Sequence, residues 1–168
     1  MNIKRLLMLA LVALPLAVVA QMKIATVDVQ SVFDAMPESR QASEQLEKAS
    51  QQFKAEYEMM QVEFNGKYAA YQGLGTDTPA TIRDRRVREI QESNSAIDAF
   101  LAKSQASLAT MKQELEAPIY AKINAAIKAV GDAGQYTYII DVSKTPVVYS
   151  GVGAIDVTMQ VRKALGVD

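Results

Sequence analysis

Two aspartates, Asp28 and Asp141, are the residues best placed for acid–base chemistry, because each ends a short segment rich in β-branched residues. A pair of carboxylates can serve as general acid and general base. The chain, however, has no histidine and no cysteine. Their absence excludes the Ser-His-Asp and Cys-His arrangements and leaves only carboxylates as zinc ligands, which is uncommon. We therefore interpret the two aspartates as strand-end caps and expect neither an enzyme nor a cofactor.

A dense positive cluster lies about halfway along the chain and consists of Arg83, Arg85, Arg86 and Arg88. These guanidinium groups could contact anionic headgroups or the carboxylates of a protein partner. The neighbouring Asp84 and Glu89 favour a simpler interpretation, a solvated helix face with its own ion pairs. The whole chain has a formal charge of −1 and no basic tract. We therefore expect no nucleic-acid partner, and contact with a membrane surface stays open.

Flexible and aromatic side chains gather just before this cluster, at Met59, Met60, Phe64, Tyr68, Tyr71 and Leu74. Methionine adapts to varied surfaces, and aromatic rings offer a large contact area. This set is therefore the candidate surface for binding another polypeptide. The alternative is that the same side chains pack against a neighbouring helix. Packing explains Met59 least well, because it lies off the apolar repeat of its segment.

Two long segments that surround these residues have helical periodicity. Residues 38–72 are rich in good helix formers and place apolar side chains at steps of three or four, at Ala42, Leu46, Ala49, Phe53, Tyr57, Met60, Phe64, Tyr68 and Tyr71. Residues 79–133 have a stricter seam that alternates steps of three and four, at Val87, Ile90, Asn94, Ile97, Leu101, Ser104, Leu108, Met111 and Leu115. This alternation is typical of a heptad, and its two polar members predict loose packing.

The segment between the two helices predicts a tight turn, since residues 73–79 contain two glycines and a proline. We expect the glycines of this segment, Gly73 and Gly75, to allow a left-handed end to the first helix. We expect Thr78 to cap the next helix, with Pro79 at its first position. Farther along, Pro118 interrupts the second helix and should bend it. The two segments thus predict an antiparallel helical hairpin.

The two ends of the chain predict a small base of short strands and helices. The expected elements are strands at 23–27 (or to 29), 136–142 and 146–149, and helices at 31–36 and 157–165, the last capped by Asp156 and ended by Gly166. Three short strands make a marginal sheet, so we expect subunits to associate through this base. The residues expected to build it and to join subunits are Ile24, Val27, Val29, Phe33, Tyr138, Ile140, Val142 and Val148.

The first twenty residues have the pattern of a secretory signal peptide. Lys4 and Arg5 precede a short apolar run, and Ala20 suits cleavage. The run is short for a membrane-spanning helix, although an uncleaved N-terminal anchor remains the alternative. We expect residues 1–20 to be removed and residues 21–168 to form a single domain. Its base comprises 21–37 and 134–168, and its hairpin comprises 38–133 with the tip near 73–79.

The order of these elements and several local motifs resemble the Skp (OmpH) family of periplasmic chaperones. The motifs that carry the resemblance are KIATVD at 23–28, VFDAMPE at 32–38, Pro118-Ile119, GQYTYIID at 134–141 and IDVT at 155–158. The resemblance covers essentially all of the mature chain. The helical middle contributes little to it, because any helical hairpin has a similar composition.

The resemblance implies an α+β fold in which a long antiparallel helical hairpin projects from a small strand-containing base. It implies a periplasmic homotrimer that encloses unfolded outer-membrane β-barrel proteins without ATP and passes them to the outer-membrane assembly machinery. The absence of a phosphate-binding GxxxxGK[ST] loop agrees with ATP independence. The best-known members are strongly basic, whereas this chain is slightly acidic. The alternative function is a periplasmic coiled-coil scaffold or adaptor that binds a folded partner.

Overall fold

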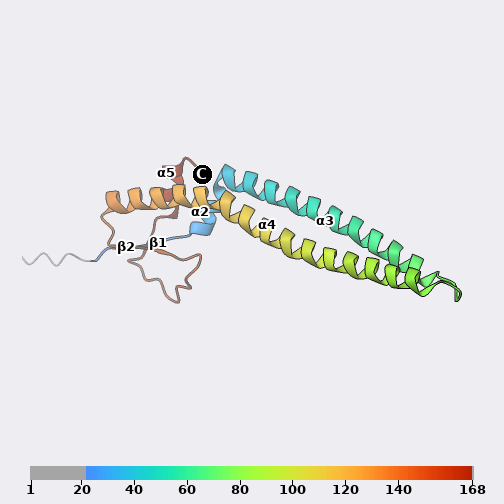
Figure 1. The fold of residues 1–168 in the computed structure, drawn as a ribbon. Helices are drawn as coiled ribbons and strands as arrows, with labels where there is room; N and C mark the ends of the chain where they lie inside the picture. Colours follow the sequence, from blue (N-terminus) through green and yellow to red (C-terminus); the bar gives the residue numbers. More distant parts are fainter. Residues whose placement is uncertain (1–21, 168) are drawn as a thin grey trace, which may run out of the picture.

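The computed structural model describes residues 22–167, so the predicted signal peptide lies outside the described residues. A long helical hairpin projects from a small base, which contains three short strands and two short helices (Figure 1). In chain order the elements are β1 (Ile24–Val27), α2 (Val29–Ala35), α3 (Pro37–Gln72), α4 (Ala80–Gly134), β2 (Tyr138–Asp141), β3 (Ile155–Asp156) and α5 (Thr158–Leu165). The α+β fold and its hairpin are therefore confirmed.

The base contains a three-stranded parallel sheet with the order β2-β1-β3. Strand β1 is central and pairs Ile24 with Tyr138 in β2 and Ala25 with Ile155 in β3. The predicted strand at 146–149 is wrong, because the third strand is β3, farther along the chain. Alternation of side chains along β1 buries Ala25 and Val27 and exposes Ile24.

The hydrophobic core lies on one face of this sheet. Its members come from every part of the base and from the two ends of the hairpin that join it: Ala25, Val27, Val29, Val32, Phe33, Met36, Ala42, Ile119, Ile123, Ala126, Val157 and Val161. Helix α4 thus has two roles, since its last third packs in this core while its first two thirds form one side of the hairpin. The base and the hairpin are consequently joined by one continuous helix.

The two aspartates singled out for acid–base chemistry act as caps in the base. The Asp28 carboxylate accepts a hydrogen bond from the Ser31 amide at 2.9 Å and begins α2 at Val29, two residues before the predicted start. The Asp141 carboxylate accepts from the Ser143 amide and hydroxyl at 2.9 and 2.6 Å, and from the Val29 amide at 3.4 Å. These bonds satisfy backbone amides at chain turns.

The hairpin is a thin two-helix structure whose seam differs from the predicted heptad. Phe53 of α3 meets Phe100 of α4 edge to face, with 6.1 Å between ring centroids. Ser104 is buried, whereas Asn94 and Leu101, two predicted seam positions, are exposed. An α-helix drifts by about 20° per heptad relative to a strict 3.5-residue repeat. The drift brings Phe100 into the seam in place of Leu101.

At the tip of the hairpin, the end of α3 and the start of α4 both differ from the predictions. Gly73 ends α3 with φ −78°, so that helix has no left-handed end. Helix α4 follows Pro79 without any side-chain cap, so Thr78 does not cap it. Arg83 instead reaches back, donating from Nη2 to the Gly75 carbonyl at 2.6 Å and from Nε to the Thr78 carbonyl at 3.3 Å. The arginine satisfies loop carbonyls that the predicted cap would not have reached.

Helix α4 stays helical through Pro118 and changes direction in that region, where its colour turns from yellow to orange in Figure 1. Its end is set by Gln135, which adopts a left-handed conformation with φ 52°. The side chain of Tyr136 then folds back over Gly134, so closely that a Cβ atom there would lie 2.1 Å from the ring. Glycine at 134 therefore makes room for the aromatic ring.

Candidate functional site

The six residues predicted to bind another polypeptide are divided between the seam and the surface of the hairpin. Met60, Phe64, Tyr71 and Leu74 are half-buried, whereas Met59 and Tyr68 are exposed. Phe64 stacks on Tyr68 with 6.4 Å between ring centroids. The seam residues thus contribute to helix packing, and the surface residues leave apolar area for a partner.

Met59 belongs to an apolar patch on α3 that the sequence interpretation did not assemble. The outer patch consists of Ala55, Met59 and Val62, which border a shallow cavity with Glu58. Met59 is 66% exposed and Val62 is 72% exposed. Their spacing of i, i+4 and i+7 puts all three on one helix face. That spacing was visible in the sequence, but the stronger apolar series of the seam obscured it.

A groove along the hairpin provides a second apolar surface. Tyr57 and Phe64 from α3 and Ile97 and Leu101 from α4 line it, together with polar side chains of both helices. Leu101, displaced from the seam, therefore contributes to an open groove instead. A groove that both helices form can accept an extended chain along the hairpin axis, with apolar contacts and side-chain amides available to it.

The arginine cluster at the tip is largely occupied by contacts within the chain. Arg86 lies 2.7 Å from Glu89 and Arg85 lies 3.7 Å from the same carboxylate. The hydrogen bond from Arg86 is the main cause that holds the pKa of Glu89 below its ordinary value. With Arg83 bound to the loop, Arg88 is the one member without a hydrogen bond or ion pair among residues 22–167. The predicted ion pairs of a solvated helix face are thus found for two of the four arginines, Arg85 and Arg86, and both use Glu89.

The residues predicted to build the base and join subunits fall into two groups. Val27, Val29 and Phe33 are buried in the core of the single chain. The others face outward to different degrees: Ile24, Tyr138 and Ile140 are exposed on the open face of the sheet, Val142 is half-buried, and Val148 lies 98% exposed on the loop before β3. The first group builds the base, and the side chains of the second group form an apolar surface that the single chain does not cover.

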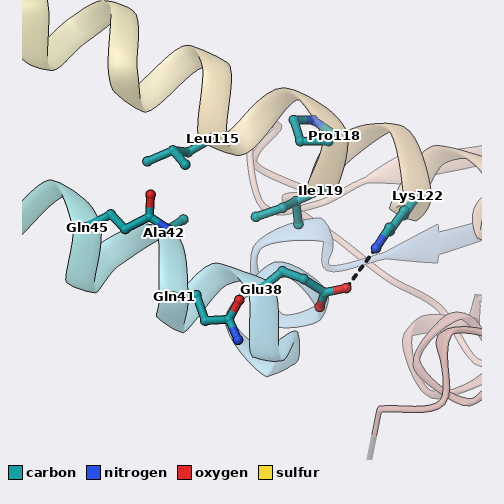
Figure 2. Close-up of a pocket in the computed structure, with 8 residues that line it drawn as sticks. All are labelled: Glu38, Gln41, Ala42, Gln45, Leu115, Pro118, Ile119 and Lys122. Carbon is teal, nitrogen blue, oxygen red and sulfur yellow. Dashed lines mark hydrogen bonds and ion pairs between the residues drawn. The ribbon is translucent and has the colours of Figure 1, made fainter.

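The joint between hairpin and base is marked by a cavity of about 180 Å³ beside Pro118. Figure 2 shows Leu115, Pro118 and Ile119 of α4 on one side and Ala42 of α3 on the other. An ion pair at 2.8 Å joins Lys122 to Glu38 across the two helices. Among residues 22–167 it is the one ion pair that links α3 to α4.

Within the described part of the chain, no group of three or more acidic side chains is arranged to hold a metal ion. No helix in residues 22–167 combines the length and the apolar character needed to cross a membrane.

Residues 22–167 thus form a helical hairpin with exposed apolar patches, carried on a small sheet, an arrangement typical of a protein that binds a partner along a projecting arm. The chain belongs to the OmpH-like outer membrane protein family, whose model matches residues 23–165. This membership confirms the predicted family and places the chain among chaperones and not among enzymes.

The fold is also similar to a solved crystal structure from Caulobacter crescentus CB15, described as a "putative outer membrane chaperone (OmpH-like)". The TM-score is 0.69 at 16% sequence identity, and the match covers 85% of this chain and 83% of the other. At this identity the similarity establishes the shared fold. No curated protein matches the sequence.

Proposed function

We propose that the mature chain is an ATP-independent holdase that binds unfolded outer-membrane β-barrel proteins in the periplasm and keeps them from aggregating. The observation that carries this proposal is the outer patch, whose two large members are about two-thirds exposed on a helix that has no neighbour on that side. Isolated apolar side chains are common on surfaces, but methionine and valine grouped on a projecting arm suit a tolerant binding surface.

The proposed mechanism is passive. Several weak apolar contacts along the hairpin hold one client chain, so their combined strength exceeds that of any single contact. Gly66 and Pro118 allow the arm to adapt to clients of different size. No fuel is needed, because each contact is weak enough to exchange. The likeness to a described outer membrane chaperone supports the client class.

We further propose that three copies associate through the base and that residues 1–20 are the cleaved signal that directs export. The mature domain then consists of a base at 21–37 and 134–168 and an arm at 38–133. The exposed sheet residues Ile24, Tyr138 and Ile140 support association, because an uncovered apolar sheet face is unfavourable in water. The resulting trimer would surround a client with three arms and deliver it to the outer-membrane assembly machinery.

The test is light scattering while a urea-unfolded outer-membrane barrel is diluted into buffer with residues 21–168, at three subunits per client and without ATP. We expect suppressed aggregation. Replacing the outer patch with Met59→Ser/Val62→Ser should raise the concentration for half-maximal suppression roughly thirtyfold, since each of the two lost contacts weakens binding by about 1 kcal/mol. The double variant Phe64→Ser/Tyr68→Ser should also suppress less.

The matched control is Gln52→Ser/Glu56→Ser, which alters two exposed polar residues of the same helix and removes no apolar side chain. It should suppress aggregation as well as the unaltered protein. If the unaltered protein leaves scattering unchanged, the holdase proposal fails for that client. A periplasmic scaffold that binds a folded partner would then be the better explanation.

A further inference from the structure

Another cavity, distinct from the outer patch and from the cavity beside Pro118, lies in the base between the sheet and α4. It has a volume of about 440 Å³, within the range of small-ligand sites. Val27, the last residue of β1, and Ile139 of β2 lie on its apolar side. The cavity therefore opens near the carboxyl ends of two parallel strands, the usual position of ligands in open parallel sheets.

Four polar side chains line this cavity: Tyr120, Asn124, Asp141 and Lys144. The Tyr120 hydroxyl, the Asn124 amide and the Lys144 ammonium make no hydrogen bond or ion pair with the described residues, and Asn124 and Lys144 are exposed to solvent. The Lys144 ammonium lies over the Tyr120 ring, 5.1 Å from its centroid. These donors therefore remain free to meet an acceptor in the cavity.

Asp141 contributes a hydrogen-bond acceptor to the cavity. Its Oδ1 atom already accepts from Val29 and Ser143, while its Oδ2 atom accepts from no described residue. Burial acts to raise the pKa of Asp141, but the hydrogen bonds from Ser143 and Val29 and the charge of Lys144 outweigh burial and hold the pKa below its ordinary value. Burial also raises the pKa of Tyr120, with help from the charges of Glu116, Asp141 and Asp34. The carboxylate stays an acceptor and the phenol stays a donor at neutral pH.

We propose that this cavity binds the carboxylate of an N-acylated amino acid that has an apolar side chain. This group is found at the C-terminus of a polypeptide and in free N-acylated amino acids. The carboxylate would meet the ammonium of Lys144 and the donors of Tyr120 and Asn124, as charge-assisted hydrogen bonds favour. The N–H group would donate to Asp141 Oδ2, and the apolar side chain would cover Val27 and Ile139. The site goes beyond the holdase proposal, because none of the residues proposed to contact a client lines this cavity.

The first experiment uses ligand-observed saturation-transfer NMR with the mature protein in its native oligomeric state. The probes are N-acetyl-leucine, its C-terminal amide, and a heptapeptide that ends in leucine. We expect the acid to bind with a dissociation constant on the order of 1 mM, as suits a ligand of about a dozen heavy atoms. The amide should bind at least tenfold more weakly, because it cannot form the charged contact with Lys144.

Binding of the peptide as well as the small acid would identify chain ends as a source of the ligand. Binding of the small acid alone would leave the site in place with free acids as its source. Equal binding of acid and amide, or no binding to the native oligomer, would overturn the proposal.

Lys144→Met tests the location of the site and should weaken binding of the acid about tenfold. Its matched control is Lys128→Met, which removes an exposed lysine of α4 that pairs with Asp132 outside the cavity. The control should bind like the unaltered protein. An unchanged affinity in Lys144→Met would place the ligand elsewhere and refute the assignment.

Aggregation of a barrel client, measured in parallel, separates this inference from the proposed function. Lys144→Met should suppress aggregation normally if the arms hold the client. In the unaltered protein, failure to bind the acid together with normal suppression of aggregation would refute only the cavity site. Failure to suppress aggregation with normal binding of the acid would refute only the holdase proposal.

Discussion

At the scale of single residues, Arg83 is the side chain that organises the tip. Its guanidinium donates to the carbonyls of Gly75, Thr76 and Thr78 in the loop between α3 and α4. Arginine suits this position because its planar fork presents several donors in fixed directions. A lysine has one compact ammonium group and cannot reach the same carbonyls together.

We expect Arg83→Ala to loosen the loop at 73–79 without unfolding the base. Hydrogen exchange should accelerate about fivefold or more in the loop, as the loss of roughly 1 kcal/mol of local stability implies. Arg88→Ala removes an arginine from the same cluster that makes no such bonds, and exchange in the loop should stay unchanged. Equal exchange in the two variants would contradict the role of Arg83 at the tip.

Two glycines in the long helices respond to the same substitution in opposite ways. Gly134→Ala would place a Cβ atom 2.1 Å from the Tyr136 ring and displace it from the Lys23 ammonium, 4.4 Å from the ring centroid. We expect a loss of about 1–3 kcal/mol in the free energy of unfolding. Gly66→Ala has open space and should gain up to about 1 kcal/mol, because alanine favours a helix.

Urea unfolding followed by circular dichroism checks both glycine variants under one set of conditions. A Gly134→Ala protein as stable as the unaltered one would show that the Tyr136 ring moves away without cost. A destabilised Gly66→Ala protein would show that the last quarter of α3, around Gly66, makes contacts that a single chain lacks.

At the scale of elements, the joint between hairpin and base depends on the side chains of α3 and α4 around Pro118. Proline cannot donate the backbone hydrogen bond that an interior helical residue normally makes, so the helix is weakest where the hairpin meets the base. The Glu38–Lys122 ion pair bridges the two helices at this point. The contact therefore limits how far α3 and α4 can separate.

The hydrogen bond from Lys122 is the main cause that holds the pKa of Glu38 below its ordinary value. A carboxyl group whose pKa is lowered on folding stabilises the folded state above its unfolded pKa, and this stabilisation disappears as pH falls through the folded pKa. The joint should therefore loosen in acid, below the ordinary pKa of glutamate. Lys122→Met should return the pKa of Glu38 towards its ordinary value.

Carbon-13 NMR titration of the Glu38 side-chain carboxyl measures this pKa directly. Lys128→Met serves as the control, because that lysine pairs with Asp132 and not with Glu38. An identical Glu38 titration in the unaltered protein and in Lys122→Met would show that the ion pair does not form in solution.

At the scale of the whole molecule, the open face of the sheet is the surface through which we propose that subunits associate. Tyr138 is 59% exposed, and Ile24 beside it in β1 and Ile140 in β2 are also exposed. Tyr138→Asp/Ile140→Asp should abolish the proposed trimer, because burying two carboxylates in an apolar interface is costly. The fold of each chain should survive, since neither side chain belongs to the core.

Light scattering coupled to size-exclusion chromatography measures the mass of this variant. The control Met59→Asp introduces a charge on the arm, far from the sheet along the hairpin, and should keep the mass of the unaltered protein. A double variant that also keeps that mass would refute association through this face. Loss of helical circular dichroism in the variant would instead show that the two residues stabilise the single chain.

The sequence alone determined the order of elements, the hairpin and the position of its tip, because these depend on local chemistry. Long runs of helix formers specify helices whatever surrounds them, and a segment with two glycines and a proline ends them near 73–79. The capping role of Asp28 also follows from a short-range hydrogen bond, which it accepts from the Ser31 amide at 2.9 Å. The prediction for Asp156 was wrong by one residue, because the N-cap of α5 is Val157, although the Asp156 carboxylate accepts from the Thr158 amide at 2.8 Å. The family resemblance was likewise readable from motifs at the two ends of the chain.

The tertiary structure decided which residues face each other and which face water. Strand propensity favoured 146–149, but pairing with β1 occurs at β3, because a strand forms where a partner edge is in reach. The heptad pattern favoured Leu101, but helical drift brought Phe100 into the seam. The meeting of Tyr120, Asp141 and Lys144 in one cavity depends on contacts between distant segments, which no local pattern in one sequence specifies.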